Sequence, residues 1–487
     1  MSEKFLTYEE FGAKGDGVTD DFDAIIATHE EANKTGAPVK AKDGATYYIG
    51  AHLKTARIRT NVDFGTAKFI IDDRGLEDRL YDIFSVEPET PKFFPVIPPM
   101  KRGQKKVDFP HEGNVYVCIF NNNHKIFIRE GLNMNDGTAT TDCFTVDGEG
   151  NISPSIDWDY PEITNAWAIN IDDAPITVSG GEFTTIANDE ESFYRYHFRG
   201  LIVKRANTTV DGVKHYVIGE EDHGAPYRGF LCVHETANVT VKNCVITGHK
   251  IFYTESKVPG KPVAMGSYDM CANTAVNVKF INVKQSNDIN DTTKWGVFTS
   301  NFSKDLYFDG CTLSRFDAHQ GVTNVTLKNC TLGHEGALLI GYGEALIENC
   351  EMRCYDVFNL RPDYGAIWDG NITIRNCYWN FTPITYWTKN YSSTVVFNAG
   401  NNGKHNFGFT CRLPRKLVID GLRINDEKLS SPIYILPHYQ TDEVCERPFA
   451  YLPPEEVYVR GITTEHGTPV KIASNMELYE NTKFDVE

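Results

Sequence analysis

The chain has 487 residues, of which 41% are hydrophobic and 23% are charged, a composition that is ordinary for a globular protein. Its net charge of −18 argues against nucleic acid as a partner, because nucleic-acid binding relies on many phosphate contacts from Lys and Arg. No apolar run approaches the ~18 residues that a membrane-spanning helix needs, so we do not expect a membrane protein.

The first residues do not show a basic segment followed by an apolar one, which is the pattern of a secretory signal. We therefore expect either a cytoplasmic protein or a secreted protein whose leader is not part of this sequence. The oligomeric state is left open, and a homo-oligomer is compatible with the sequence.

The first fifty residues predict a cap made of a turn, a helix and two short strands. Residues 11–21 are rich in Gly and Asp, which favours a turn, and Thr19 and Asp20 are suitable helix N-caps. One face of the following helix carries Ala24, Ile25, Thr28 and Ala32. A strand-turn-strand segment then ends at Ile49. We expect the helix to cover the open end of the repeat described next, which would otherwise expose apolar core and unpaired backbone.

A short block then recurs along the chain between residues 208 and 462. Each copy contains a strand with alternating apolar side chains, an Asn or Gly at a bend, and a small apolar residue. The clearest copies end at Cys244, Cys311, Cys330, Cys350 and Cys377. A strand-and-turn repeat this short cannot bury its own apolar face, so its copies must stack on one another. We therefore predict an all-β solenoid of about a dozen parallel coils over residues 51–465.

The five cysteines of the repeat occupy one column. In stacked parallel coils, neighbours in a column lie ~4.8 Å apart with parallel side chains, a geometry that suits a disulfide badly. We predict that these cysteines are reduced and buried, since a free Cys behaves as a small hydrophobic residue. Zinc is not expected, because the sequence contains no Cys-x-x-Cys pair.

The run from Phe11 to Asp21 reads Phe-Gly-Ala-Lys-Gly-Asp-Gly-Val-Thr-Asp-Asp, and a helix and the strand turn Gly44-Ala-Thr-Tyr47 follow it. This opening resembles that of the pectate-lyase-like right-handed β-helix superfamily, which begins with Phe-Gly-Ala-x-Gly-Asp-Gly-x-x-Asp-Asp. The superfamily includes polysaccharide lyases, glycoside hydrolases such as polygalacturonases, epimerases and phage tailspikes. The resemblance implies a right-handed parallel β-helix. We place its N-terminal cap at residues 1–50 and a C-terminal cap or tail at residues 466–487.

Four stretches interrupt the repeat, near residues 86–112, 146–166, 379–413 and 430–455. In a solenoid, such insertions form loops on the side wall and often build the binding face. The third insertion is rich in aromatic residues, including Trp379 and Trp387. Because the apolar faces of sugars pack on aromatic rings, we predict a sugar-stacking wall there and assign Trp387 to substrate binding.

The coils between residues 269 and 364 place polar and ionisable residues where other coils have Leu and Ile. Equivalent positions in successive coils lie ~4.8 Å apart, so acids that are distant in sequence can share a cleft. A glycosidase needs a proton donor and a second carboxylate, ~5 Å apart in retaining enzymes and farther apart in inverting ones. The predicted catalytic residues are Asp269, Asp317, His319 and Asp363. Asp317 and His319, two apart on a strand, should point to the same face.

The predicted substrate-binding residues lie on the same coils or next to them. They are Asn301, Gln320, Arg361, Tyr364, His234 and Glu235, in addition to Trp387. Arg361 could clamp a sugar carboxylate or hydroxyls through its planar fork, and Asn301 could instead belong to an Asn ladder inside the solenoid. Polygalacturonases carry an acid, a His and an Arg on consecutive coils, and the chain order Asp269, His319, Arg361 loosely resembles this arrangement. At these positions the chain lacks their Asn-Thr-Asp, Asp-Asp and Arg-Ile-Lys motifs.

Three functions fit these residues. The favoured one is a glycoside hydrolase that acts on a poly- or oligosaccharide. The second is a polysaccharide lyase that works by β-elimination beside a uronic acid, with His319 or Tyr364 as the base and Arg361 as the neutralising cation. The third is a non-catalytic, tailspike-like carbohydrate binder. No cofactor or metal is expected, although the acidic loop 219–224 leaves calcium open as an alternative to a solvated loop.

Overall fold

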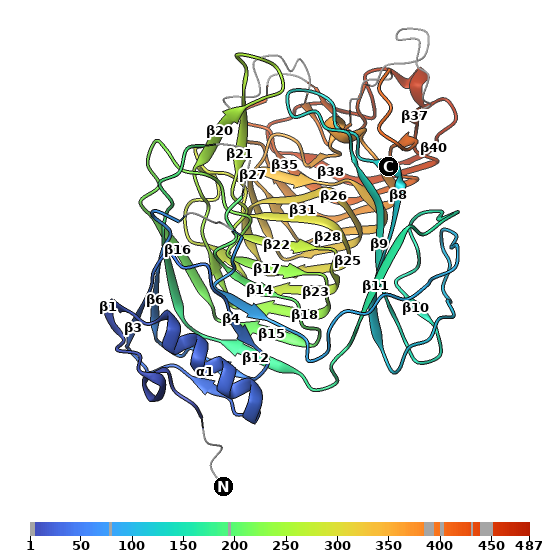
Figure 1. The fold of residues 1–487 in the computed structure, drawn as a ribbon. Helices are drawn as coiled ribbons and strands as arrows, with labels where there is room; N and C mark the ends of the chain where they lie inside the picture. Colours follow the sequence, from blue (N-terminus) through green and yellow to red (C-terminus); the bar gives the residue numbers. More distant parts are fainter. Residues whose placement is uncertain are drawn as a thin grey trace.

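The computed structural model describes residues 5–76, 80–192, 196–383, 394–399, 404–429, 432–438 and 451–487. Its body is a stack of coils with a helix at the N-terminal end and a smaller sheet along one side (Figure 1). One sheet system contains 29 strands, and each of them pairs in parallel with a strand of the next coil. None of the helices in this described part of the chain has the length and apolar character of a membrane span.

The strands of the coils form three faces, and we call the face that carries the candidate site the groove sheet. The groove sheet contains β4 (Ala56–Ile58), β7 (Phe84–Val86), β14 (Leu201–Val203), β17 (Leu231–His234), β22 (Met270–Asn273), β30 (Phe358–Asn359), β33 (Phe397–Asn398) and parts of β25 (Phe298–Asp309), β26 (Thr312–Lys328) and β27 (Thr331–Leu338). The strand β26 is long enough to run through all three faces of its coil.

The other two faces follow the groove sheet in each coil. The second face contains β2 (Val39–Lys40), β5 (Val62–Asp63), β12 (Ile176–Ser179), β15 (Thr208–Asp211), β18 (Ala237–Lys242), β23 (Val276–Ile281), β28 (Gly341–Glu348), β40 (Lys483–Val486) and parts of β31 (Trp368–Asn380), β35 (Lys416–Asn425) and β38 (Glu456–Thr464). The third face contains β1 (Asp16–Asp20), β3 (Thr46–Ile49), β6 (Lys68–Asp72), β13 (Glu182–Ile186), β16 (Lys214–Ile218), β19 (Val245–Ile246), β24 (Lys284–Gln285) and β29 (Glu351–Met352).

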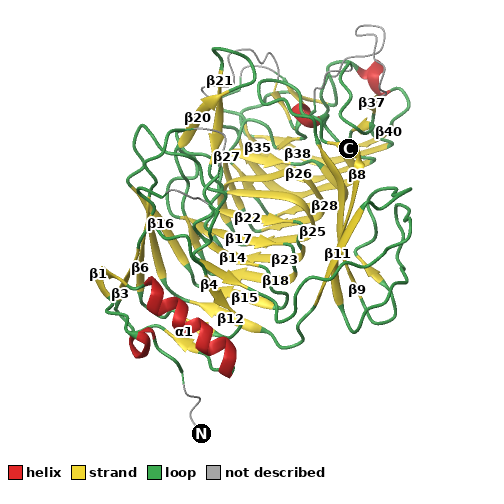
Figure 2. Cartoon of the chain, in the orientation of Figure 1, coloured by secondary structure: helices red, strands yellow, loops and turns green. Residues whose placement is uncertain are grey.

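Short elements decorate the coils. They are the hairpin β20 (Ile251–Glu255) and β21 (Pro262–Gly266), the strands β32 (Thr394–Val395), β34 (Cys411–Arg412), β36 (Ile433–Tyr434), β37 (Tyr451–Leu452) and β39 (Val470–Lys471), and the 3₁₀ turns η1 (Tyr8–Phe11), η2 (Pro362–Tyr364) and η4 (Met476–Tyr479). Helix α1 (Phe22–Thr35) lies at the N-terminal end of the coils and buries Ile25 and Ala32 (Figure 2).

The bend between the second and third faces explains the Asn of the repeat. Asn243, Asn282, Asn329 and Asn349 have φ angles of 55°, 52°, 52° and 54°, a left-handed conformation that Asn tolerates better than most residues. Their side chains form ladders from coil to coil: Asn282 donates to Oδ1 of Asn243 over 3.0 Å. The Asn therefore both makes the bend and ties neighbouring coils together.

Identical side chains stack in columns inside the coils. Phe69 and Phe183 stack with ring centroids 4.6 Å apart, and so do Phe280 and Phe308. The five cysteines of the repeat are buried and free, as predicted. A disulfide that was not predicted joins Cys232 and Cys271, which are register partners on β17 and β22.

Residues 87–175 leave the coils as one insertion. Strands β5, β6 and β7 pair directly with β12, β13 and β14, so the chain returns one coil later. The insertion contains an antiparallel sheet of β8 (Val115–Ile126), β9 (Thr138–Val146), β10 (Ile152–Ser153) and β11 (Asn165–Asn170), which we call the inserted sheet. The predicted insertions 86–112 and 146–166 are thus parts of one excursion with its own apolar core.

The insertion is fixed to the coils by buried charge. Lys304 of β25 is 1% exposed and forms ion pairs with Asp142 and Asp157 of the insertion, the latter over 3.0 Å. Phe127 adds an apolar contact, with its ring centroid 5.7 Å from that of Phe302. The inserted sheet therefore forms a fixed wall beside the coils.

We predict that Phe308→Ala lowers the free energy of unfolding by ~3–5 kcal/mol, because Phe308 is fully buried in an aromatic column and its removal leaves a cavity. Tyr253→Ala is the matched control: Tyr253 is 60% exposed, and its replacement should change stability by less than ~0.5 kcal/mol. Urea unfolding measures both values. Equal losses for the two variants would contradict the packed column.

Candidate functional site

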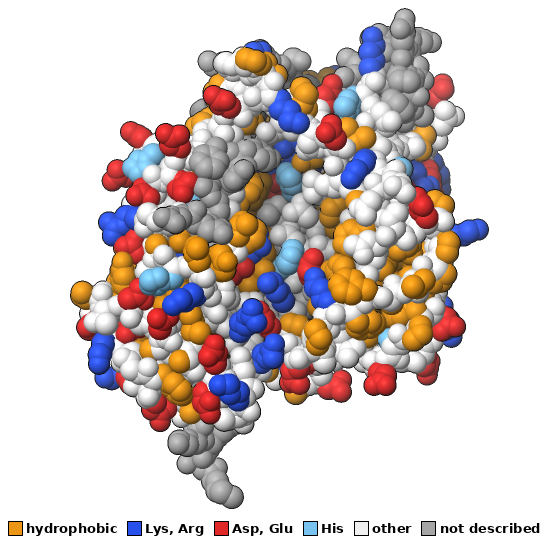
Figure 3. All heavy atoms as spheres, in the orientation of Figure 1, with side chains coloured by type: hydrophobic (Ala, Val, Ile, Leu, Met, Phe, Trp, Pro, Cys, Tyr) orange, Lys and Arg blue, Asp and Glu red, His pale blue; other side chains and the backbone are white. Residues whose placement is uncertain are grey.

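The outer face of the groove sheet lies under a hollow of the molecular surface (Figure 3). Phe298 and Phe316 are register partners whose rings face the core. Because neighbouring side chains of a strand point to opposite faces, Thr299 and Asp317 face outward instead. The groove sheet thus presents columns of side chains, one per coil, toward the hollow.

One outward column is polar over four coils. Register pairs His234 with Asn273, Asn273 with Asn301, and Asn301 with Gln320. The side-chain amide of Asn301 donates to Oδ1 of Asn273 over 2.7 Å. Asn301 does belong to an amide ladder, but this ladder lies on the outer face and is partly exposed. We call His234, Asn273, Asn301 and Gln320 the polar column.

Asp317 is the centre of an ion-pair cluster next to this column. Its carboxylate accepts hydrogen bonds from Nη1 of Arg361 at 2.9 and 3.1 Å, from the hydroxyl of Tyr268 at 3.1 Å, and from Arg315. Arg315 also donates to Glu335 over 2.6 Å. Asp317 is completely buried. In this position the carboxylate holds the two arginines, and its burial weighs against the predicted catalytic role of Asp317.

Asp363 is the exposed carboxylate of the cluster. It is the second residue of η2, which begins after Arg361, and the φ of 55° at Arg361 turns the chain sharply. Nε and Nη2 of Arg361 donate to the two oxygens of Asp363 at 3.0 and 2.9 Å, and Arg129 of the insertion contacts the same carboxylate at 2.8 Å. The side chain of Asp363 is 31% exposed. A ligand in the hollow can therefore reach Asp363.

His319 is placed by an irregularity in β26. Thr299 pairs with Asp317, but Asn301 pairs with Gln320, so β26 has one extra residue between these pairs, as in a β-bulge. Nδ1 of His319 lies 3.2 Å from Oδ1 of Asn301, and Nε2 lies 3.2 Å from the hydroxyl of Tyr364. This geometry assigns the ring proton to Nδ1, since the amide oxygen accepts, and leaves Nε2 to accept from Tyr364.

The arginines set the charge states of the cluster. Burial raises the pKa of Asp317 and Asp363, but the guanidinium groups beside them outweigh burial and hold both pKa values below the usual range. Burial, helped by the charge of Arg361, lowers the pKa of His319 to about 3. At neutral pH the cluster therefore combines ionised carboxylates and guanidinium groups with a neutral His319.

The structure does not bring Asp269 into this cluster. Asp269 precedes Met270 at the corner before β22, and one coil earlier the equivalent position is Phe230, a core residue. Its carboxylate accepts from Nδ1 of His215 at 2.8 Å, from the amide of Thr247 at 2.7 Å and from Nε2 of His249 at 3.2 Å. Asp269 is completely buried. Its side chain turns into the coil, so the predicted shared cleft with Asp317 is wrong.

The network around Asp269 is also the place where the described residues could hold a metal ion. The ligand atoms of His215, His249 and Asp269 all lie within 4.8 Å of one another. Glu220 accepts from Nδ1 of His249 at 2.8 Å, as an outer-shell carboxylate would. All of these contacts are also complete hydrogen bonds without a metal, so the network is explained as a buried ion-pair system. Calcium at loop 219–224 stays a prediction.

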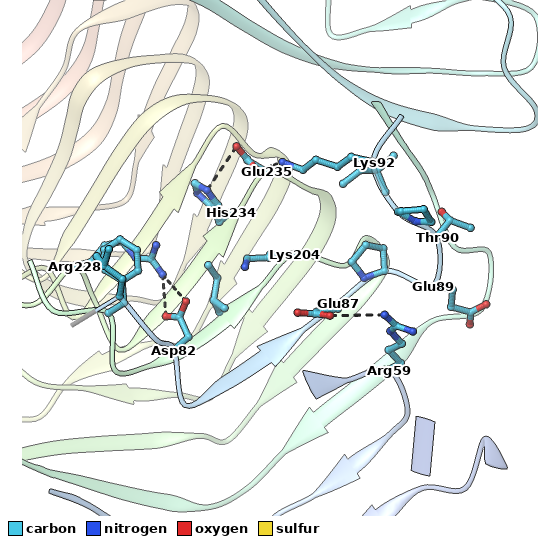
Figure 4. A pocket seen from close by; sticks show the side chains of 16 residues that line it. Arg59, Asp82, Glu87, Glu89, Thr90, Lys92, Lys204, Arg228, His234 and Glu235 are labelled. Carbon is cyan, nitrogen blue, oxygen red and sulfur yellow. Dashed lines mark hydrogen bonds and ion pairs between the residues drawn. The ribbon is translucent and has the colours of Figure 1, made fainter. Parts of the chain in front are cut away.

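His234 and Glu235 line a separate pocket of about 490 Å³ at the lower coils, between the groove sheet and residues 87–92 (Figure 4). Glu235 forms an ion pair with Lys92 and lies 3.7 Å from Nε2 of His234. Both residues thus line a cavity, and their role in a sugar subsite stays a prediction. The aromatic wall is different: Trp379 is fully buried and donates to the carbonyl of Cys354, whereas Trp387 lies outside the described residues.

The structure adds residues that the sequence did not single out. Arg315 stands two residues before Asp317, a spacing that places both on one face of β26, so its role could have been read from the sequence. Tyr268 precedes its strand, and Arg129 comes from the insertion. No local sequence pattern predicts the contacts of Tyr268 and Arg129, because they depend on how loops and the insertion pack.

No protein-family model matches the chain, and no curated protein matches it. Several solved structures do. The tailspike protein gp49 from Pseudomonas phage LKA1 is 14% identical, with a TM-score of 0.53 over 96% of this chain and 82% of that one. The Pseudomonas phage phi297 tailspike gp61 is 11% identical, with a TM-score of 0.54 over 95% of this chain and 81% of that one.

A third solved structure is the Gp54 tailspike of Acinetobacter baumannii bacteriophage AP22 in complex with A. baumannii capsular saccharide. It is 9% identical, with a TM-score of 0.54 over 99% of this chain and 79% of that one. Sequence identities this low are evidence for a shared fold and for nothing more. They confirm the predicted right-handed parallel β-helix fold.

We predict that His249 gives the protein a specific pH dependence of stability. Burial lowers the pKa of His249, but Glu220 and Asp269 outweigh burial and raise it to about 10, above the ~6.5 of an unfolded histidine. The stabilisation by His249 is therefore complete below pH ~6.5 and is lost as the pH rises toward 10. In His249→Gln this loss should be absent.

Urea unfolding of wild type and His249→Gln between pH 6 and pH 10 checks this. The difference between the two unfolding free energies should shrink as the pH rises. All other titrating groups are common to both proteins and cancel in the difference. A difference that stays constant over this range would show that His249 is not charged in the folded protein.

Proposed function

We propose that this protein is a carbohydrate-active enzyme that binds a poly- or oligosaccharide along the groove sheet and cleaves its glycosidic bonds. The observation that carries the proposal is the meeting of His319, Tyr364 and Asp363 beside the polar column, although they come from different coils. Amide and imidazole groups in that column are suited to sugar hydroxyls. The saccharide bound to the AP22 tailspike, which shares the fold, supports a glycan as the ligand here.

The geometry favours β-elimination over hydrolysis. Elimination beside a uronic acid needs a base and a cation, but it needs no protonated carboxyl group. His319 is neutral and partly exposed, whereas Tyr364 lies buried behind it, so the imidazole is the group of this pair that a sugar can reach. Arg129 lies beside this pair, with its guanidinium 5.0 Å from the Tyr364 ring, and its buried Nε has no hydrogen-bond partner among the described residues. Arg129 can thus neutralise the carboxylate of a bound uronate, a role that the sequence suggested for Arg361.

The elimination proceeds as a proton transfer and a bond cleavage. The carbon–hydrogen bond next to the sugar carboxylate breaks, and its proton goes to the His319–Tyr364 pair. The electron pair forms a carbon–carbon double bond while the bond to the leaving sugar oxygen breaks. The pair then gives the proton to that oxygen. One glycosidic bond is replaced by an unsaturated sugar and a free hydroxyl, with no other reactant.

Hydrolysis, the function favoured from the sequence, is the second candidate. Asp363 is ionised and 31% exposed, so it fits the base or nucleophile of a glycosidase. Such an enzyme also needs a protonated carboxyl group as the acid. Asp317, which lies across Arg361 from Asp363, has a lowered pKa and is buried, so it does not fit that role.

The products decide between these reactions. We predict that digestion of uronic-acid polysaccharides produces new chain ends together with the ultraviolet absorbance of an unsaturated uronate. New reducing ends without that absorbance would establish hydrolysis instead. Retained binding with neither signal would make the protein a non-catalytic binder and end the enzymatic proposal.

We predict that His319→Ala and Tyr364→Phe each lower turnover by ~10²–10⁴-fold, the usual contribution of a positioned acid or base. Substrate binding and the unfolding temperature should change little. His223→Ala is the matched control, because His223 is exposed and lies outside the cluster. Wild-type turnover in both cluster variants would remove these residues from the reaction.

A further inference from the structure

The pocket at the lower coils is a continuation of the polar column. Val203 is the register partner of Val233, so the next residues, Lys204 and His234, follow each other in this column. From His234 the column passes through Asn273 to Asn301, which contacts His319. Three coil steps of ~4.8 Å put the pocket about 14 Å from the His319 cluster.

Charge in the pocket is balanced except at one place. Arg228 pairs with Asp82 at 2.9 Å, Arg59 lies 3.8 Å from Glu87, and Lys92 pairs with Glu235. The fourth acid, Glu89, is exposed and lies 3.8 Å from Arg205, which contacts Asp172 more closely at 3.2 Å. Among the cations of the lining, Lys204 is therefore the one that forms no ion pair with a described residue.

Lys204 stands in the middle of the lining side chains, with the paired groups around it (Figure 4). Its ammonium group has no carboxylate partner among the described residues, and it is only partly exposed. A half-buried ammonium group without a partner is a ready site for an anion.

The lining residues also carry polar atoms that lack a partner. Nε of Arg59, Oγ1 of Thr90, Nε of Arg228 and Nδ1 of His234 are buried and make no hydrogen bond to any described residue. Burial lowers the pKa of His234 to about 4, so its ring is neutral and can bond to a hydroxyl group.

The remaining lining is apolar and matches the size of a small-molecule site. Leu80, Pro88, Pro91, Ile169, Phe198 and Ile202 contribute to the wall. The volume of about 490 Å³ falls in the usual range of ~300–1,000 Å³ for ligand pockets. A sugar combines the required properties, because it has an apolar ring face and several hydroxyl groups.

We propose that this pocket is a subsite for an acidic sugar residue, with its carboxylate bound by Lys204 and its ring packed on the apolar part of the lining. The inference rests on the proposed function, since it assumes that a glycan lies along the groove sheet. It makes the substrate an acidic polysaccharide that spans the pocket and the His319 cluster.

The test compares acidic oligosaccharides with their methyl esters, which have the same sugar rings without the charge. Probes are hexamers of galacturonate, of alginate and of heparosan, and calorimetry at low salt measures their binding. We expect wild type to bind at least one acidic hexamer and to bind its methyl ester more weakly, by about 10- to 100-fold for each charge-assisted hydrogen bond that the ester loses, at Lys204 and at Arg129.

Substitutions of Lys204 test whether this residue causes the preference for the acidic hexamer over its ester. Lys204→Met should weaken the acidic hexamer by the same factor and leave the ester unchanged, and Lys204→Arg should restore most of the affinity. Lys214→Met, at an exposed lysine of the third face, is the control and should behave as wild type.

Three results would overturn the inference: no acidic hexamer binds, acid and ester bind equally, or Lys204→Met binds the acid as wild type does. Cleavage assays on the same samples keep the two proposals apart. If the protein cleaves a glycan but binding does not depend on Lys204, the subsite is disproved and the proposed enzyme stands. If binding depends on Lys204 but no glycan is cleaved, the subsite stands and the proposed enzyme is disproved.

Discussion

Hydrogen bonding between coils in strict parallel register is the constraint on which the site depends. It places equivalent residues of successive coils ~4.8 Å apart, so a column of side chains becomes a continuous surface. The same register stacks phenylalanines inside and lines up His234, Asn273 and Asn301 outside. Groups that are distant in sequence, such as His319 and Tyr364, meet because their coils lie on top of one another.

Fixed charge gives this surface its chemical character. Asp317 is buried between arginines, so it acts as an anchor that keeps Arg361 in place for contact with Asp363. The insertion supplies Arg129 from the other side and is itself held by the buried ion pairs of Lys304. Breaking a buried pair of this kind by removing one partner is costly, so the arrangement is stiff. A preorganised set of charges around a neutral His319 is suited to proton transfer.

The fold was predictable because strand alternation and bend residues recur in every coil. The His319 cluster was partly predictable, since its members lie on strands of the groove sheet or just after them. Asp269 was misplaced by a shift of one position: it occupies the corner that Phe230 and Val297 occupy in neighbouring coils, where side chains turn inward. The contact of Arg129 was beyond sequence reasoning, because it depends on how the whole insertion 87–175 packs on the coils.

A crystal structure of the inactive His319→Ala variant, soaked with an acidic oligosaccharide that wild type cleaves, tests the central claim most directly. The account predicts one glycan chain lying across the coils, over the polar column, with a carboxylate at Lys204 and a glycosidic bond beside Tyr364 and Asp363. A glycan bound on another face of the coils, or on the far side of the inserted sheet, would contradict it.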